Sequence, residues 1–230
     1  MNKKSISIIV PVLNEEKIIK SFIENLLVKS FYKNDIIVVD GGSRDSTTNI
    51  LKKFSELRIF KSKKGRATQM NYGALKAKNE ILYFLHCDSI PPKNFDQIIF
   101  NQYTEGKEMG CFRMLFKGSH IFLKFSSFFT RFNYKICRGG DQSLYISKNL
   151  FKSLKGFNEK YTYCEDMEFI DRLYRYGKFN VIQQDIITSN RRFIENGTIK
   201  LQFHFTVIHT LRLFGYSAFK IKSYYEKYVK

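Results

Sequence analysis

The feature that most constrains the fold is a regular alternation of two kinds of segment through the first 85 residues. Runs rich in Ile, Val, Leu and Phe, typical of buried strands, occur at residues 5–10, 35–39, 57–61 and 80–85. Segments with helical character follow the first three runs, at residues 14–30, 45–54 and 65–78. Strands that alternate with helices predict a mostly parallel sheet flanked by helices.

The second half of the chain is less regular. We expect helices at residues 92–103, 120–136, 165–176 and from residue 197 to the end. We expect strands at residues 109–117, 143–146 and 179–189, the last as one or two short strands. Gly177 can close the third of these helices, and Asn14 can cap the first helix of the chain.

Bulk composition favours a folded protein with an anionic partner. The 230 residues suit one domain, or one domain with an appendage, and a hydrophobic content of 43% argues against disorder. The formal charge of +18 indicates a partner such as a phosphorylated small molecule or an acidic membrane surface. The apolar run at residues 6–13 is too short for a membrane span, and the four cysteines lie too far apart for a zinc site. We therefore expect a cytoplasmic protein with reduced thiols.

Polar clusters follow the expected strands at the points where the strands end. They read Asn14-Glu15-Glu16, Asp40-Gly41-Gly42-Ser43, Lys63-Lys64-Gly65-Arg66 and His86-Cys87-Asp88. Ligands of such sheets collect at the carboxyl ends of the strands. The coincidence of four clusters therefore predicts one binding site at this edge.

Each of these clusters also has a purely structural interpretation. Asp40 can accept from a base or ribose, or it can shape a tight turn that caps a helix. Residues 63–66 can form a phosphate site or a solvated basic loop. Asp88 can hold Mg²⁺ or Mn²⁺ together with substrate phosphates, or it can cap the helix expected near Pro92.

Two later clusters are equally open. Glu165 and Asp166 stand at the start of a helix, where carboxylates are common, but a like-charged neighbour also raises one pKa and can produce a general base. Arg191 and Arg192 can close over a diphosphate or lie on the surface.

The motifs taken in order resemble a known family. They read "ISIIVPVLNEE", "IIVVDGGSRDST", "GRATQMNYGA", "YFLHCDSIPP", "GGDQSLYI", "GFNEKYTYCEDMEFIDRL" and "TSNRRF". This series resembles the family 2 glycosyltransferases of the GT-A fold, which is Rossmann-like. The similar branch is the small bacterial "transferase 2" group, often labelled arsenosugar-biosynthesis or diaponeurosporenoate-type. The resemblance implies a GT-A domain over 1–195, with a nucleotide-binding half (1–105), an acceptor-binding half (106–195) and a helical extension (196–230).

The resemblance also implies an activity, which is the inverting transfer of a sugar from a nucleotide diphosphate to an acceptor hydroxyl. The nucleotide-sugar site would comprise Pro11, Asn14, Glu15, Asp40, Gly42, Ser43, Arg66 and Asp88. Asp88 would hold Mg²⁺ or Mn²⁺, and Asp166, with Glu165 beside it, would be the general base. Asp141 and Gln142 would line the acceptor side, and Arg191 and Arg192 would stabilise the diphosphate. The sequence departs from the family pattern at His86, where the first D-x-D carboxylate is usual, and at Gly41, where a second Asp is usual.

The C-terminal segment suggests a membrane partner. Residues 201–221 are apolar but carry Arg212 and Lys220, which a membrane-spanning helix disfavours. A basic amphipathic helix on the anionic inner face of the cell membrane fits better, and residues 120–136 could add to that surface. Packing on the core and a dimer interface are the alternatives. A membrane position would suit a lipid-linked or otherwise apolar acceptor.

Two other functions compete with glycosyl transfer. A sugar nucleotidyltransferase shares the α/β layout but has an early G-x-G-T-R loop, where this chain has P-V-L-N-E-E. A catalytically degenerate relative could bind nucleotide or membrane only, as the missing D-x-D carboxylate suggests, although Asp166 argues against it. Nucleic-acid binding has little support because the basic residues are dispersed.

Overall fold

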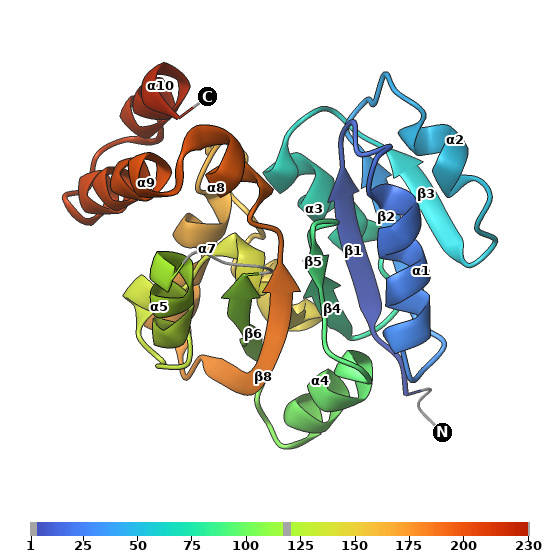
Figure 1. Cartoon of the computed structure of the whole chain (residues 1–230). Helices are drawn as coiled ribbons and strands as arrows, with labels where there is room; N and C mark the ends of the chain where they lie inside the picture. The colour runs from blue at the N-terminus through green and yellow to red at the C-terminus, as the bar shows by residue number, and fades with distance from the viewer. Residues whose placement is uncertain (1–3, 117–120, 230) are drawn as a thin grey trace.

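The computed structural model describes residues 4–116 and 121–229. Its first part alternates strands and helices as the sequence predicts (Figure 1). The elements are β1 (Ser7–Val12), α1 (Ile19–Lys29), β2 (Asp35–Asp40), α2 (Thr47–Leu51), β3 (Leu57–Lys61), α3 (Arg66–Lys76) and β4 (Ile81–Phe84). The bounds of β3 agree with the prediction, and those of the other three strands lie within about two residues of it.

The second part contains shorter elements. They are β5 (Ser89–Ile90), α4 (Phe95–Thr104), β6 (Met109–Phe116), α5 (Ile121–Phe129), the 3₁₀ turns η1 (Lys135–Cys137) and η2 (Gly140–Gln142), β7 (Leu144–Ser147), α6 (Lys148–Ser153), α7 (Glu165–Tyr176), β8 (Asn180–Thr188), α8 (Arg191–Asn196), α9 (Thr198–Leu213) and α10 (Ala218–Tyr228). The bounds of α7 are as predicted, and the segment expected to hold one or two strands is the single strand β8.

Two local predictions are wrong, and three short elements are not predicted. Asn14 does not cap α1, because its φ is 56° and its side chain accepts a hydrogen bond from the Arg44 backbone N–H at 2.8 Å. The helix predicted over 120–136 ends at Phe129, where Thr130 turns away and its hydroxyl accepts from the Met114 N–H of β6. Residues 117–120 lie outside the described part. Helices α6 and α8, of six residues each, and the two-residue strand β5 are not predicted.

All the strands form one sheet, in the order β3-β2-β1-β4-β7-β6-β8-β5. Strands β3, β2, β1 and β4 are parallel, so their carboxyl ends meet at one edge. Strand β7 is antiparallel to both β4 and β6, and β5 is antiparallel to β8. The predicted α/β architecture is therefore confirmed, with its antiparallel strands confined to the second half.

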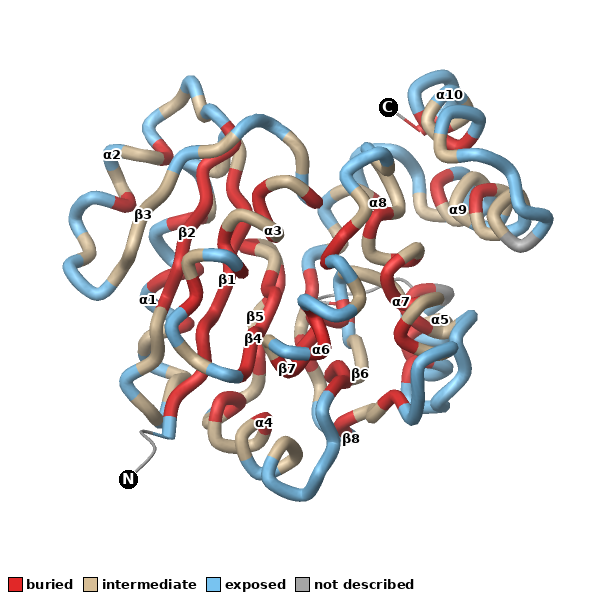
Figure 2. The backbone as a smooth tube through the Cα atoms, turned by 180° about the vertical axis from the view of Figure 1, so that it is seen from behind, coloured by how far each residue is buried: buried red, intermediate tan, exposed pale blue. Residues whose placement is uncertain are grey.

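Helices bury both faces of the sheet. Ile8 of β1 belongs to the apolar cluster under α1 and α4, whereas its neighbour Ile9 belongs to the cluster under α3, α6 and α7. Such alternation is expected of a strand buried on both sides. Figure 2 shows the buried strands running through the middle of the molecule. This rigid centre fixes the strand ends on which the site is built.

The C-terminal segment is helical, as predicted, and packs on a third apolar cluster. Leu201 and Ile208 of α9 and Ile221 of α10 meet Phe193 of α8 and Leu123 of α5 there. Figure 1 shows α5, α9 and α10 at the end of the molecule away from β1, β2 and β3. Among the helices of the described residues, none combines the length and the apolar character that crossing a membrane requires.

Candidate active site

The loops after β1 and β2 are joined into one unit. The Asn14 N–H donates to the Ser43 hydroxyl at 2.9 Å, and the Glu15 N–H donates to the Thr47 hydroxyl at 2.8 Å. These bonds explain why Asn14 faces the neighbouring loop instead of its own helix. Pro11 and Val12 continue β1 into this loop in extended conformation and are buried.

Asp40 shapes the turn at the end of β2. It is 1% exposed, and its Oδ1 accepts from the Ser43 N–H at 2.9 Å and from the Ser43 hydroxyl at 2.6 Å. Gly42 has a φ of 97°, a value that suits glycine. Asp40 therefore makes the tight turn of the structural interpretation, and its contact with a nucleoside stays a prediction.

Gln69 of α3 is a residue that the sequence reasoning missed. Its Nε2 donates to the carbonyls of Val12 and Val39, at 2.8 Å each, and so ties α3 to the ends of β1 and β2. A Cβ on Gly41 would lie 2.9 Å from the Gln69 Oε1, so glycine at this position makes room for the amide. The sequence signal for Gln69 is a polar residue among the apolar residues on the buried side of α3.

Four carboxylates surround Arg66 at the start of α3. Desolvation favours the neutral guanidine, but Glu165, Asp141, Asp88 and Asp166 outweigh it and raise the pKa of Arg66. These groups come from α7, η2 and the end of β4, which are far apart in the sequence. The structure thus brings together the residues expected at the diphosphate, at the base and on the acceptor side.

His86 and Asp88 follow β4. Burial, and secondly Arg66, lower the pKa of His86 to about 4, so this side chain is neutral at pH 7. Asp88 is half-buried, and its backbone carbonyl accepts from the Ser189 N–H at 3.1 Å. Asp88 also lines a cavity of about 220 Å³ between α1 and the residues around Arg191. The predicted helix cap is not formed by Asp88, since α4 begins at Phe95 after Asn94.

Glu165 and Asp166 begin α7. Glu165 is 3% exposed, and burial, followed by repulsion from Asp166, raises its pKa to about 7. Asp166 lies against the backbone of Gly140, where an added Cβ would stand 2.5 Å from the Asp166 Oδ2. Any larger residue at this position would therefore displace the carboxylate. The sequence reasoning did not identify this contact.

The side chain of Asp141 lies near Arg66 and Asp88, whereas that of Gln142 lies in the protein interior. Desolvation by the surrounding groups of the site, followed by the charge of Asp88, raises the pKa of Asp141 to about 6. Gln142 is buried, and its Oε1 accepts from Arg138 Nη1 at 2.7 Å. Arg138, a second residue that was missed, is 3% exposed and also donates to the carbonyls of Thr130 and Phe132. Gln142 and Arg138 therefore hold the turn that presents Asp141.

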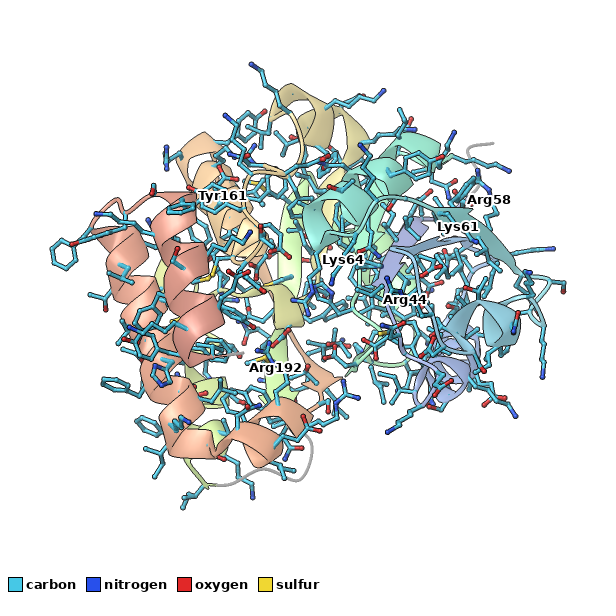
Figure 3. The ribbon with its side chains drawn as sticks, turned by 90° about the horizontal axis from the view of Figure 1, so that it is seen from above. Arg44, Arg58, Lys61, Lys64, Tyr161 and Arg192 are labelled. Carbon is cyan, nitrogen blue, oxygen red and sulfur yellow. The ribbon has the colours of Figure 1, made fainter. Side chains whose placement is uncertain are left out.

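Arg191 and Arg192 lie across the site from the first two loops. Arg191 stands 4.0 Å from the Glu15 carboxylate. Arg192 donates a hydrogen bond to the Tyr225 hydroxyl of α10. The positive charge of Arg192 also offsets part of the rise in the pKa of Asp141. Figure 3 looks down on the carboxyl ends of the parallel strands, with Lys64 and Arg44 on one side and Arg192 on the other. Cations thus flank the carboxylates from both halves of the molecule.

The residues present fit a divalent cation only in company with a substrate. In the part of the chain that the structure describes, no three His, Cys, Asp or Glu side chains form a group able to hold a metal. Asp88, which follows β4, offers an oxygen ligand of the kind that Mg²⁺ and Mn²⁺ prefer. Mg²⁺ commonly binds through one or two carboxylates plus substrate phosphates and water, and Asp88 suits that arrangement.

Comparison with known proteins identifies the fold and the family. Residues 7–164 match the family described as "Glycosyl transferase family 2". A probable glycosyltransferase of Bacillus subtilis, YdaM, is 24% identical over 199 residues, which cover 75% of this chain and 47% of YdaM. This chain therefore spans about half the length of that relative.

Two solved structures share the fold. Staphylococcus aureus TarS, in complex with UDP-GlcNAc, has a TM-score of 0.65 and 18% identity, over 80% of this chain and 58% of its own. The mannosyltransferase PcManGT of Pyrobaculum calidifontis, in complex with GDP-Man and Mn²⁺, has a TM-score of 0.62 and 17% identity, over 79% of this chain and 56% of its own. These likenesses agree with the GT-A architecture expected from the sequence.

Proposed function

The chain belongs to glycosyltransferase family 2, and on that premise we propose that it transfers a sugar, with inversion, from a nucleotide-diphosphate donor to an acceptor hydroxyl. The observation that carries the proposal is the convergence of Asp88, Asp141, Glu165 and Asp166 on Arg66 at the carboxyl edge of the sheet. We assign the catalytic domain to residues 1–195, with halves at 1–105 and 106–195, and an extension to residues 196–230.

In this proposal the donor lies along the first two loops and the end of β4. The nucleotide-sugar site comprises Pro11, Asn14, Glu15, Asp40, Gly42, Ser43, Arg66 and Asp88. The diphosphate lies between Arg66 on one side and Arg191 and Arg192 on the other, which oppose its growing negative charge. Asp88, together with the phosphates, would hold a divalent cation, which would supply further positive charge there. The complexes of TarS with UDP-GlcNAc and of PcManGT with GDP-Man support a nucleotide-sugar donor.

Asp166 acts as the general base. The acceptor oxygen forms a bond to the anomeric carbon from the side opposite the diphosphate, and the bond from that carbon to the phosphate oxygen breaks. The electron pair leaves with the diphosphate, and the hydroxyl proton passes to Asp166. Glu165 neighbours the base, Asp141 lines the acceptor side, and Gln142 holds the turn of Asp141 through Arg138.

The test is an Asp166→Asn variant. We expect kcat to fall by about 10²–10⁴-fold, the usual contribution of a general base, while thermal stabilisation by UDP-, GDP- or dTDP-sugars with Mg²⁺ or Mn²⁺ is retained. Asp185→Asn is the control, because Asp185 pairs with Arg113 on β6, outside the site. Full transfer activity of Asp166→Asn would contradict the assignment of the base.

We also propose that the acceptor is lipid-linked or otherwise apolar, and that α5, α9 and α10 rest on an anionic membrane. Exposed large apolar side chains gather on these helices and beside them, at Ile121, Phe125, Phe128, Phe129, Phe132, Ile199, Phe203, Phe214 and Phe219. Exposed basic residues accompany them, at Lys124, Arg131, Lys135, Lys200 and Lys220. Aromatic and basic side chains together are typical of interfacial helices.

Vesicle sedimentation tests this membrane surface. We expect binding to vesicles that contain phosphatidylglycerol, weaker binding to pure phosphatidylcholine, and a further loss in the double variant Phe214→Ser, Phe219→Ser. Phe31→Ser is the control, because Phe31 is also an exposed phenylalanine but follows α1 at the other end of the molecule. Unchanged sedimentation of the double variant would remove these helices from the membrane contact.

A further inference from the structure

A small cavity opens beside Asp166 and is separate from the larger one at Asp88. Its volume is about 20 Å³, space for one group of the size of a methyl or a water. Its walls are mostly apolar side chains, from Met70, Phe84, Leu144, Phe157 and Ile170. The ring of His86 and the Asp166 carboxylate lie at its polar side.

The apolar walls are rigid. The rings of Phe84 and Phe157 meet edge to face with centroids 5.0 Å apart, and Phe157 also packs on Phe169 at 4.7 Å. Met70 and Phe84 are 2% and 4% exposed, so the protein interior holds them on their outer sides. A cavity with walls of this kind exists before a ligand arrives, and filling it costs little ordering.

The position of the cavity relates it to the donor sugar. In the proposed reaction the anomeric carbon lies between the diphosphate, near Asp88, and the acceptor oxygen, near Asp166. The sugar ring must therefore lie between these two carboxylates. His86, two residues before Asp88, and Asp166 both line the cavity, so it opens towards the ring.

We propose that this cavity receives a methyl group carried by the donor sugar, so that the enzyme prefers a 2-acetamido or a 6-deoxy sugar to the parent hexose. The inference rests on the proposed function and specifies its donor. A hydroxyl group placed against the apolar side of the cavity would lose water and find no hydrogen-bond partner among Phe84, Leu144 and Phe157, whereas a methyl group needs none. One methyl in an apolar pocket discriminates by about 10- to 200-fold.

Calorimetry on the full chain with Mg²⁺ tests the preference without knowledge of the acceptor. Donors are compared in pairs that share a nucleobase: UDP-glucose with UDP-N-acetylglucosamine, and dTDP-glucose with dTDP-6-deoxyglucose. We expect at least one methyl-bearing donor to bind about 10-fold or more tightly than its parent. The pair that shows the difference distinguishes the acetamido from the 6-deoxy source.

A substitution that fills the cavity provides a second test of the donor preference. Met70→Phe should abolish the preference and leave the affinity for the parent sugar within about 3-fold, whereas Met114→Phe, the same change outside the cavity, should keep the preference. Equal binding of both donors in every pair, or a preference that survives Met70→Phe, overturns this inference alone. Absence of binding by any nucleotide sugar, including GDP-mannose, overturns the proposed function and this inference with it.

Discussion

The negative charge of Glu165 lowers the free energy of unfolding of the protein. Burial and the neighbouring Asp166 raise its pKa from 4.5 to about 7, against the opposing effect of Arg66. The folded protein therefore keeps a proton that the unfolded chain releases between about pH 4.5 and pH 7. The free energy of unfolding falls as the pH rises through this window, because the unfolded state binds fewer protons there.

A Glu165→Gln variant should remove this dependence. We expect its melting temperature, relative to that of the parent protein and without nucleotide, to be higher at pH 8 than at pH 4.5. Asp166, Asp141 and Arg66 face Glu165 in both proteins, so the comparison isolates the one carboxyl. Glu56→Gln, at an exposed site, should shift the melting temperature equally at both pH values. An equal shift for Glu165→Gln would contradict the raised pKa.

The contact between Gly140 and Asp166 gives a second prediction at the same scale. In Gly140→Ala the new methyl would collide with the Asp166 carboxylate, which must move away. A displacement of about 1 Å in a reacting group can cost about 10²-fold in rate, so we expect a loss of that order in kcat with unchanged nucleotide affinity. Gly177→Ala is the control, because its Cβ would meet only Met109, at 3.9 Å. Wild-type kcat in Gly140→Ala would show that the base tolerates the shift.

Individual elements could be predicted where the local signal is complete. The parallel strands β1 to β4 are short apolar runs bounded by polar residues, and α7 starts with acidic residues and ends at Gly177. The capping role of Asn14 could not be predicted, because its partner, the Arg44 N–H, lies in another loop. The six residues of α6 are too few for a helical pattern to appear.

The same limit applies to the candidate site. The rule that ligands gather at strand ends correctly brought Arg66 and Asp88 to one edge. Gln69, Arg138 and Gly140 act through partners that no spacing reveals, since Gln69 contacts a carbonyl 57 residues away in the sequence. Pattern alone identifies the charged groups of the site, and the groups that hold them in place require the fold.

The contribution of Gln69 to the packing of α3 on β1 and β2 can be measured by substitution. Gln69→Leu would leave the buried carbonyls of Val12 and Val39 without this donor. Each unsatisfied buried group costs about 1–3 kcal/mol, so we expect a loss of about 2 kcal/mol or more in the free energy of unfolding, measured with urea. Gln184→Leu, on the exposed side of β8, is the control. A loss below about 0.5 kcal/mol would mean that the amide is dispensable.

At the scale of the whole molecule, Tyr225 attaches α10 to α8 and to the loop before α7. Its ring stacks on Tyr163 with centroids 3.8 Å apart, and its hydroxyl accepts from Arg192. We expect Tyr225→Ala to release α10, at a cost of about 3 kcal/mol, and to expose residues 216–229 to proteases. Limited proteolysis with mass spectrometry measures this, with Tyr176→Ala as the control at an exposed position. Equal cleavage rates in both variants would contradict the anchoring role.

The two-residue strand β5 has a consequence for how the halves of the molecule communicate. Ser89 follows Asp88 directly and pairs with Thr188 of β8, three residues before Arg191, and the two hydroxyls lie 3.1 Å apart. The pairing of β5 with β8 therefore couples the position of Asp88 to that of Arg191. We expect a displacement of α8 to move Asp88 as well, because β8 pairs with β5, and to leave the parallel strands in place.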